Sequence, residues 1–239
     1  MIKFFIAVLH HNNINNINTF LKNYFANVDS SVAELFILDN GSSETIYNDI
    51  VNIHSNYNNW NLLRSEENTG VIGGRNLLFD VFSDRIQDYS GILFLDDDQF
   101  ITSPKFLSLY TKRINNGFDV LGYEAWQMNK NLLPKIKVKN YGDRFTYVGC
   151  GGMYISSAVF KSVGKFDEIF NPCYFEDPDY NFRCVENGYK IDWIPNLPVI
   201  HKAHSTLSKR GDRKSRFRNS WSEFKKKWNG RVPEKTYLI

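Results

Sequence analysis

Short apolar runs alternate with helix-like segments through the first hundred residues, and this alternation restricts the fold more than any other feature. The apolar runs are Ile2–Leu9, Leu35–Leu38, Trp60–Arg64 and Ile92–Leu95. The helix-like segments between them are 14–25, 42–53 and 73–82. Such β-α-β-α order predicts an α/β fold with a Rossmann-like, mainly parallel sheet, right-handed connections and helices on both faces. In such sheets ligands bind beyond the carboxyl ends of the strands.

The second half of the chain is less regular. We expect a helix to begin at Ser103-Pro104, because proline is favoured in a first helical turn. Further strands are expected at 118–123, 135–139, 145–155, 191–194 and 197–201, and further helices at 158–163 and 178–187. Since the sequence has neither an internal repeat nor a Gly/Ser linker, we assign residues 1–239 to a single domain.

Composition excludes several classes of protein. A net charge of +3 gives no reason to expect a nucleic-acid partner. The three cysteines are an odd number without a CxxC pair, so we expect reduced thiols in a cytoplasmic protein and neither a disulfide framework nor a zinc site. The start, MIKFFIAVLHHNN, is too short in its apolar part for a signal peptide. No apolar stretch approaches the roughly 18 residues of a membrane span.

The fourth apolar run ends on three adjacent carboxylates, in the stretch GILFLDDDQF at 91–100. Like charges this close repel one another unless a positive partner lies among them. One interpretation is a solvated turn. The other is a divalent-cation site, because alternate residues at a strand end point the same way and Asp96 and Asp98 would face one ion. Carboxylate oxygens suit Mg²⁺ or Mn²⁺, which hold phosphate oxygens in turn.

Four further motifs stand in order along the chain. They are LDNGSS at 38–43, NTGVIGGRN at 68–76, GCGGM at 149–153 with VGKFD at 163–167 and FEDPD at 175–179, and VIHKAHST at 199–206. Together with the apolar strand ending in Asp-x-Asp, they resemble family 2 of the GT-A fold glycosyltransferases, which are inverting and depend on nucleotide sugars. The resemblance extends from Ile6 to about Thr206. It implies a single GT-A domain with a smaller mixed sheet on the acceptor side.

The resemblance implies a role for individual residues on the donor side. The expected nucleotide-binding residues are Asp39, Asn68, Gly70, Arg75, Asp96 and Asp97. Arg75 could contact the diphosphate or the base, or could simply be a surface arginine. The expected ligands of a Mn²⁺ or Mg²⁺ cofactor are Asp96, Asp98 and His201, with His204 as the competing histidine.

On the acceptor side, the resemblance places the catalytic base in the acidic pair Glu176-Asp177. We assign the base to Asp177 and a supporting role to Glu176, while Asp179 could be a capping or structural acid. Gly151, Gly152 and Trp126 are expected next to the transferred or accepting sugar.

The function implied is transfer of a sugar from a UDP- or dTDP-sugar to a hydroxyl of a glycan or lipid-linked saccharide, as in polysaccharide biosynthesis. Residues 1–100 would bind the donor, 101–206 would hold the acceptor, and 207–239 form a basic segment. Two alternatives remain, a sugar nucleotidyltransferase and a non-catalytic sugar- or nucleotide-binding module. The sequence His10-His11-Asn12-Asn13 speaks against the first, because a Gly-rich basic signature usually follows strand one there.

The basic segment 209–231 has ten Lys or Arg residues interleaved with Trp221, Phe224 and Trp228. Three interpretations are open. It could be a solvated amphipathic helix, a segment that closes over the donor diphosphate, or a peripheral contact with an anionic membrane at the cytoplasmic face.

Overall fold

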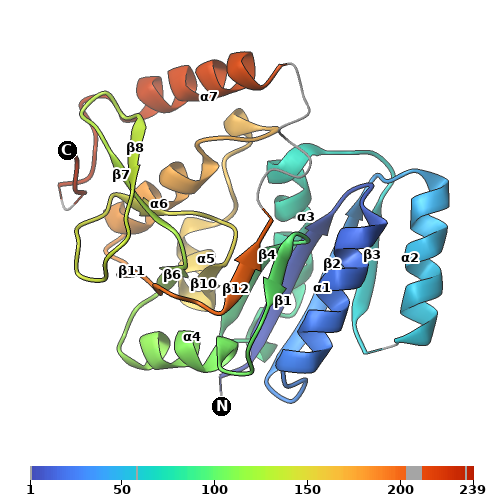
Figure 1. Ribbon diagram of the computed structural model, residues 1–239. Coiled ribbons are helices and arrows are strands. Elements are labelled where there is room, and N and C mark those ends of the chain that lie inside the picture. The colour runs from blue at the N-terminus through green and yellow to red at the C-terminus, as the bar shows by residue number, and fades with distance from the viewer. Residues whose placement is uncertain (1, 58, 203–211, 235) are drawn as a thin grey trace.

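The structure is a computed structural model that describes residues 2–57, 59–202, 212–234 and 236–239 (Figure 1). Its central feature is a seven-stranded sheet in the order β11-β6-β10-β4-β1-β2-β3. The strands are β1 (Phe4–His10), β2 (Ala33–Asn40), β3 (Asn61–Ser65), β4 (Gly91–Asp96), β6 (Val120–Gly122), β10 (Met153–Ser156) and β11 (Ile191–Trp193). The first four strands are parallel and β10 is antiparallel to both its neighbours. The predicted α/β fold with a mainly parallel sheet is confirmed.

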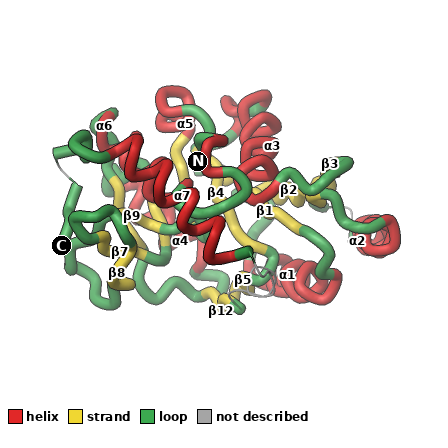
Figure 2. The backbone as a smooth tube through the Cα atoms, turned by 90° about the horizontal axis from the view of Figure 1, so that it is seen from above, coloured by secondary structure: helices red, strands yellow, loops and turns green. Residues whose placement is uncertain are grey.

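Helices cover both faces of the sheet, because alternate residues of each strand carry apolar side chains to opposite sides. Phe4, Ile6 and Val8 of β1 pack with α1 (Ile14–Asn27), whereas Phe5 and Ala7 pack with α3 (Gly70–Asp84). The remaining helices are α2 (Glu44–Asn56), α4 (Phe106–Asn115), α5 (Ser157–Val163), α6 (Glu176–Glu186) and α7 (Arg213–Trp228), with 3-10 turns at Ile86–Asp88 and Glu168–Phe170. Figure 2 shows α3, α5 and α6 on one side of the sheet and α1 on the other.

Two small antiparallel sheets stand beside the central one. One pairs β5 (Gln99–Ile101) with β12 (Val199–His201), and the other contains β7 (Ala125–Met128), β8 (Pro134–Lys137) and β9 (Tyr147–Val148). Neither β5 nor β7 was expected. The strand expected at 145–155 is wrong as one element, because β9 and β10 belong to different sheets and the turn 149–152 separates them. The division of the chain near residues 100 and 206 stays a prediction.

The basic C-terminal segment forms helix α7, whose aromatic side chains enter the core. Phe224 and Trp228 are fully buried, and Phe224 packs on Phe175 and Phe182. The interpretation of this segment as a merely solvated helix is therefore wrong for residues 213–228. Residues 203–211, which include His204, lie outside the described part of the chain. Within that part, no helix has the length and apolarity needed to cross a membrane.

Candidate active site

A pocket of about 520 Å³ lies at the carboxyl ends of the parallel strands, where ligands were expected. Eleven of the thirteen predicted site residues line it: Asn68, Gly70, Arg75, Asp96, Asp97, Asp98, Trp126, Gly151, Glu176, Asp177 and His201. Asp39 and Gly152 do not line it. Gly152 turns inward at φ +85°, and a Cβ there would lie 2.6 Å from the Tyr123 ring. Its expected position next to a sugar stays a prediction.

Each carboxylate of the aspartate triplet has a different basic partner. Asp96 Oδ1 accepts a hydrogen bond from Arg75 Nη2 at 2.8 Å, and Asp97 Oδ2 lies 2.7 Å from His10 Nδ1. Asp98 Oδ1 lies 3.3 Å from His201 Nε2. The three side chains thus diverge toward α3, β1 and β12, and this divergence relieves the repulsion between adjacent like charges.

The predicted metal ligands come together from two chain segments. One ligand atom each of Asp96, Asp98 and His201 lies within 4.8 Å of the others. Asp96 and Asp98 are brought side by side by the tight turn between β4 and β5, and His201 is brought opposite by the β5–β12 pairing. Two carboxylates and one imidazole fit Mn²⁺ better than Mg²⁺, which prefers an all-oxygen shell.

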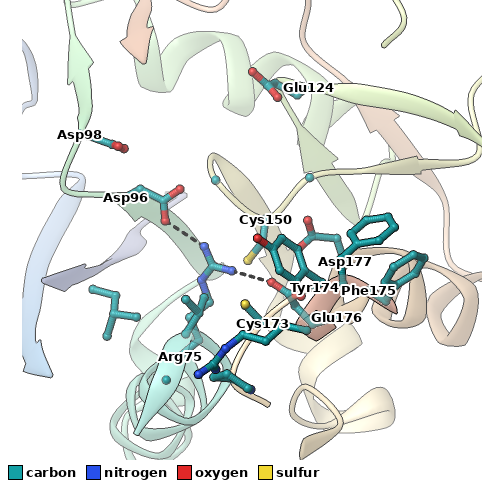
Figure 3. A pocket seen from close by; sticks show the side chains of 18 of the residues that line it. Arg75, Asp96, Asp98, Glu124, Cys150, Cys173, Tyr174, Phe175, Glu176 and Asp177 are labelled. Carbon is teal, nitrogen blue, oxygen red and sulfur yellow. Dashed lines mark hydrogen bonds and ion pairs between the residues drawn. The ribbon is translucent and has the colours of Figure 1, made fainter. Parts of the chain in front are cut away.

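Arg75 bridges the two acidic groups of the pocket, as the dashed lines in Figure 3 show. Besides Asp96, its guanidinium contacts Glu176 Oε1 at 3.4 Å, and the residue is only 5% exposed. Burial opposes its charge, but the surrounding carboxylates outweigh burial and raise the pKa of Arg75 above its usual value. The interpretation of Arg75 as a surface arginine is wrong, and its guanidinium is occupied by protein carboxylates.

The acidic pair Glu176-Asp177 opens helix α6 directly beside the pocket (Figure 3). The two preceding residues, Tyr174 and Phe175, have φ values of +78° and +69°. Residues other than glycine rarely adopt this left-handed backbone conformation. Burial and the neighbouring Glu176 charge raise the pKa of Asp177 well above its usual value. Burial also raises the pKa of Glu176, against the opposing effect of Arg75.

Asp179, the third acid of this motif, is a structural residue. It is fully buried and accepts hydrogen bonds from Arg183 Nε at 2.9 Å and Trp228 Nε1 at 2.8 Å. Lys227 Nζ lies 2.7 Å from the same carboxylate. Asp179 therefore ties α7 to α6, two residues after Asp177.

The predicted donor residues near β2 and α3 divide into two kinds. Asn68 Oδ1 accepts a hydrogen bond from Gly70 N at 2.9 Å, and a Cβ on Gly70 would collide with Asn171 and Pro172, so both residues shape the start of α3. Asp39 is different. It is fully buried, and neither carboxylate oxygen has a hydrogen-bond partner among the described residues.

The sequence did not single out the wall opposite the aspartates. Glu124, which directly follows an expected strand, lines the pocket near Lys137 and His201. The Nζ atom of Lys137 lies 2.5 Å from Glu124 Oε1. Despite burial, its contacts with these two residues lower the pKa of Glu124 to about 2. Burial opposes the charge of His201, but hydrogen bonds to Asp98 and Glu124 raise its pKa to about 10.

Aromatic and basic residues complete the pocket. The aromatic lining consists of Tyr123, Trp126, Tyr147, Tyr174, Phe175 and Phe217. Arg213 and Arg216, from the first turn of α7, add positive charge to the lining. A pocket with a cation site, buried acids and aromatic surfaces has the parts needed to bind an anionic sugar donor.

Comparison with known proteins identifies the family and the fold. The family model described as Glycosyl transferase family 2 matches residues 5–176. That range contains the aspartate triplet, Arg75 and Glu176, whereas Asp177, His201 and α7 lie beyond it. The comparison with curated proteins gave no significant match.

Solved structures share the fold at low sequence identity. A crystal structure of S. aureus TarS 1-349 superposes with a TM-score of 0.61 at 18% identity over 83% of the chain. GalNAc-T7 with UDP, GalNAc and Mn²⁺ gives a TM-score of 0.68 at 13% identity over 84%. The mannosyltransferase PcManGT from Pyrobaculum calidifontis, in complex with GDP-Man and Mn²⁺, gives a TM-score of 0.65 at 11% identity over 86% of the chain. The present chain spans 59%, 44% and 58% of these three chains, respectively. The common architecture is the GT-A fold.

Proposed function

Because the chain belongs to glycosyl transferase family 2, we propose that it transfers a sugar from a nucleoside-diphosphate sugar to a hydroxyl group of a glycan or lipid-linked acceptor, with inversion at the anomeric carbon. One observation carries the proposal. The cluster Asp96, Asp98 and His201 faces the same pocket as the buried pair Glu176-Asp177. The pocket thus offers a leaving-group side and a proton-accepting side.

On the leaving-group side, Asp96, Asp98 and His201 would hold a Mn²⁺ ion. That ion supplies the positive charge that the departing diphosphate requires. Arg75 holds Asp96 Oδ1 at 2.8 Å and leaves Oδ2 of the same carboxylate for the ion. We assign Asp39 to the nucleoside half of a UDP- or dTDP-sugar, since a buried carboxylate whose two oxygens have no hydrogen-bond partner in the described part of the chain calls for N–H or O–H donors.

On the acceptor side, we assign the general base to Asp177. As the acceptor oxygen attacks the anomeric carbon and the bond to the diphosphate breaks, the carboxylate takes the hydroxyl proton. Its raised pKa makes it a stronger base than an exposed aspartate. Glu176 Oε1 contacts Arg75, whereas Asp177 Oδ1 has no hydrogen-bond partner among the described residues, and we therefore prefer Asp177 over Glu176 as the base. Trp126 and Gly151 line the space for the sugars.

The first turn of α7 supports a role for this helix at the donor site. Arg213 and Arg216 line the pocket, where their charge would meet the diphosphate or a charged acceptor. The aromatic residues Phe224 and Trp228 are buried within the protein, so they are not available to insert into a membrane.

The test is release of nucleoside diphosphate from a panel of sugar nucleotides, with and without Mn²⁺ and a candidate acceptor. We expect Mn²⁺-dependent turnover in the parent protein. Asp177→Asn should lower kcat by roughly 10²-fold or more with nearly unchanged nucleotide affinity. Glu176→Gln should be milder. Ordinary turnover in Asp177→Asn would move the base elsewhere, and nucleotide binding without turnover in the parent would favour a non-catalytic binding module.

The pH profile gives a second check on the base. Because the folded-state pKa of Asp177 is raised, the protonated, inactive form persists to higher pH than for an exposed aspartate. The acidic limb of kcat should therefore lie at a higher pH than the ordinary pKa of an aspartate would give, and Asp177→Asn should abolish that limb.

A further inference from the structure

The histidine of the predicted metal cluster has a different neighbour at each ring nitrogen. His201 Nε2 lies 3.3 Å from Asp98 Oδ1, a carboxylate oxygen of the same cluster. His201 Nδ1 lies 2.7 Å from the Tyr123 hydroxyl and 3.9 Å from Glu124 Oε1, and both of these residues line the pocket. Nε2 is therefore the nitrogen on the side of the cluster, and Nδ1 points away from it toward Tyr123 and Glu124.

Coordination of an ion by Nε2 restricts where the ring carries its proton. A nitrogen that binds a metal presents a lone pair, so the proton of a neutral ring is then on Nδ1. That proton requires an acceptor, and the Tyr123 oxygen at 2.7 Å is in position to accept it. A tyrosine hydroxyl that accepts this hydrogen bond still has its own proton to donate, so it requires a further acceptor.

Glu124 is the acceptor that the structure offers to the Tyr123 hydroxyl. Its carboxylate accepts hydrogen bonds from Tyr123 and from Lys137 Nζ, the latter at 2.5 Å. Because a carboxylate only accepts hydrogen bonds, the direction of the whole chain is defined. His201 Nδ1–H donates to the Tyr123 oxygen, and the Tyr123 hydroxyl donates to Glu124. Lys137 supplies the counter-charge for the carboxylate at the end of this chain.

The Tyr123 ring is itself held in place by the central sheet. Tyr123 directly follows β6, which ends at Gly122, whereas His201 belongs to the separate sheet of β5 and β12. Gly152 packs against the ring so closely that a Cβ there would lie 2.6 Å from Tyr123 Cδ1. The Gly152 carbonyl accepts a hydrogen bond from the Tyr110 hydroxyl at 2.7 Å. The contact between Tyr123 and His201 therefore ties the histidine to the rigid part of the fold.

We propose that Tyr123 and Glu124 are positioning residues for the metal site. Together they hold the His201 ring with its proton on Nδ1, so that the lone pair of Nε2 is directed at the ion beside Asp98. They act through His201 and are not ligands themselves. This inference rests on the proposed function, since it requires that the cluster of Asp96, Asp98 and His201 binds a divalent cation.

Charge-neutral and charge-matched substitutions separate this role from packing and from electrostatics. Tyr123→Phe removes the hydroxyl and keeps the ring. Tyr154→Phe is the matched control, because Tyr154 is also buried and its hydroxyl donates to the Ser90 carbonyl at 2.9 Å, outside the pocket lining. Glu124→Gln keeps an acceptor oxygen for Tyr123, whereas Glu124→Met does not. Both variants of Glu124 remove the same charge, so the difference between them reports the acceptor alone.

The probes are Mn²⁺ and Mg²⁺, each titrated alone by calorimetry, with urea unfolding of the metal-free proteins as a check on folding. We expect Tyr123→Phe to weaken Mn²⁺ binding by about tenfold, the usual scale for losing a partner of a ligating histidine. Mg²⁺ binding should weaken by less than about threefold, because Mg²⁺ relies on oxygen ligands. Tyr154→Phe should change neither affinity by more than about twofold, and Glu124→Met should weaken Mn²⁺ binding more than Glu124→Gln does.

The outcomes distinguish this inference from the proposed function. Equal Mn²⁺ affinity in Tyr123→Phe and the parent overturns the inference alone. Equal losses for Mn²⁺ and Mg²⁺ also overturn it, because they indicate a distorted pocket and not a misdirected histidine, and so does an equal loss of Mn²⁺ affinity in Tyr154→Phe. Equal Mn²⁺ affinities in Glu124→Gln and Glu124→Met remove Glu124 from the proposal. Failure of the parent to bind Mn²⁺ overturns the metal-assisted function as well.

Discussion

Arg75 is the residue whose removal should disturb this protein most specifically. Its guanidinium contacts Asp96 at 2.8 Å and Glu176 at 3.4 Å, and only 5% of the residue is exposed. Arg75→Met keeps most of the volume but leaves both carboxylates without their buried counter-charge. Breaking a buried ion pair from one side costs about 3–5 kcal/mol. With a urea m-value of roughly 2–3 kcal/mol/M, the unfolding midpoint should fall by roughly 1–2.5 M at pH 7.5.

The loss of stability in Arg75→Met should depend on pH in a defined direction. Burial raises the pKa of Glu176 and Arg75 opposes this effect, so the variant raises the pKa of Glu176 further in the folded state. A carboxyl group with a raised folded-state pKa destabilises the protein fully above that pKa, and less as the pH falls toward the unfolded value of about 4.3. The stability difference between parent and Arg75→Met should therefore be smaller at pH 5 than at pH 7.5.

Arg85→Met is the matched control, because its ion pair with Glu34 at 2.9 Å is partly exposed. Such pairs are worth about 0–1 kcal/mol. Equal losses in the two variants, or a loss in Arg75→Met that is the same at both pH values, would refute the assignment of Arg75 as a buried bridge.

Two further substitutions test the metal site and the C-terminal helix. A Cβ on Gly151 would lie 2.7 Å from Asp96 Oδ2, so Gly151→Ala should weaken Mn²⁺ binding by roughly tenfold. Gly149→Ala, whose Cβ has only an ordinary 3.8 Å contact, should leave calorimetric Mn²⁺ affinity nearly unchanged, and equal affinities in both variants would argue against this steric reasoning. Trp228→Phe removes a fully buried indole and its 2.8 Å hydrogen bond to a carboxylate, which should cost about 2–4 kcal/mol in chemical denaturation. Trp221→Phe, which loses a bond to a carbonyl at 3.1 Å on the surface, should cost less than about 1 kcal/mol, and a similar cost in both would contradict the packing of α7.

The parallel half of the sheet could be predicted because each strand is a continuous apolar run. Strands buried on both faces, such as β1 and β4, have this pattern, and the helices between them have caps such as Ser43. β5 and β7 were missed for a physical reason. They have three and four residues, too few for alternation to be distinguished from a loop.

Most residues of the candidate site could be predicted, but only some of their pairings. The aspartate triplet and the acidic pair stand out in the sequence because such charge is unusual next to buried segments, and His201 was expected beside Asp96 and Asp98. The contacts of His10 with Asp97 and of Arg75 with Asp96 and Glu176 were not predicted, because they depend on strand register and helix packing. Glu124 was missed because a single carboxylate after a strand carries no signal of its own.

The attachment of α7 to Asp179 has a consequence for the order in which the protein becomes competent. Trp228 and Lys227 hold the carboxylate two residues from Asp177, yet they are separated from it by about fifty residues of chain. During synthesis the parallel strands β1 to β4 emerge first, and the acidic pair remains without this support until residue 228 has left the ribosome. The segment that holds Glu176 and Asp177 therefore gains its support from α7 only after the strands of the central sheet have been synthesised.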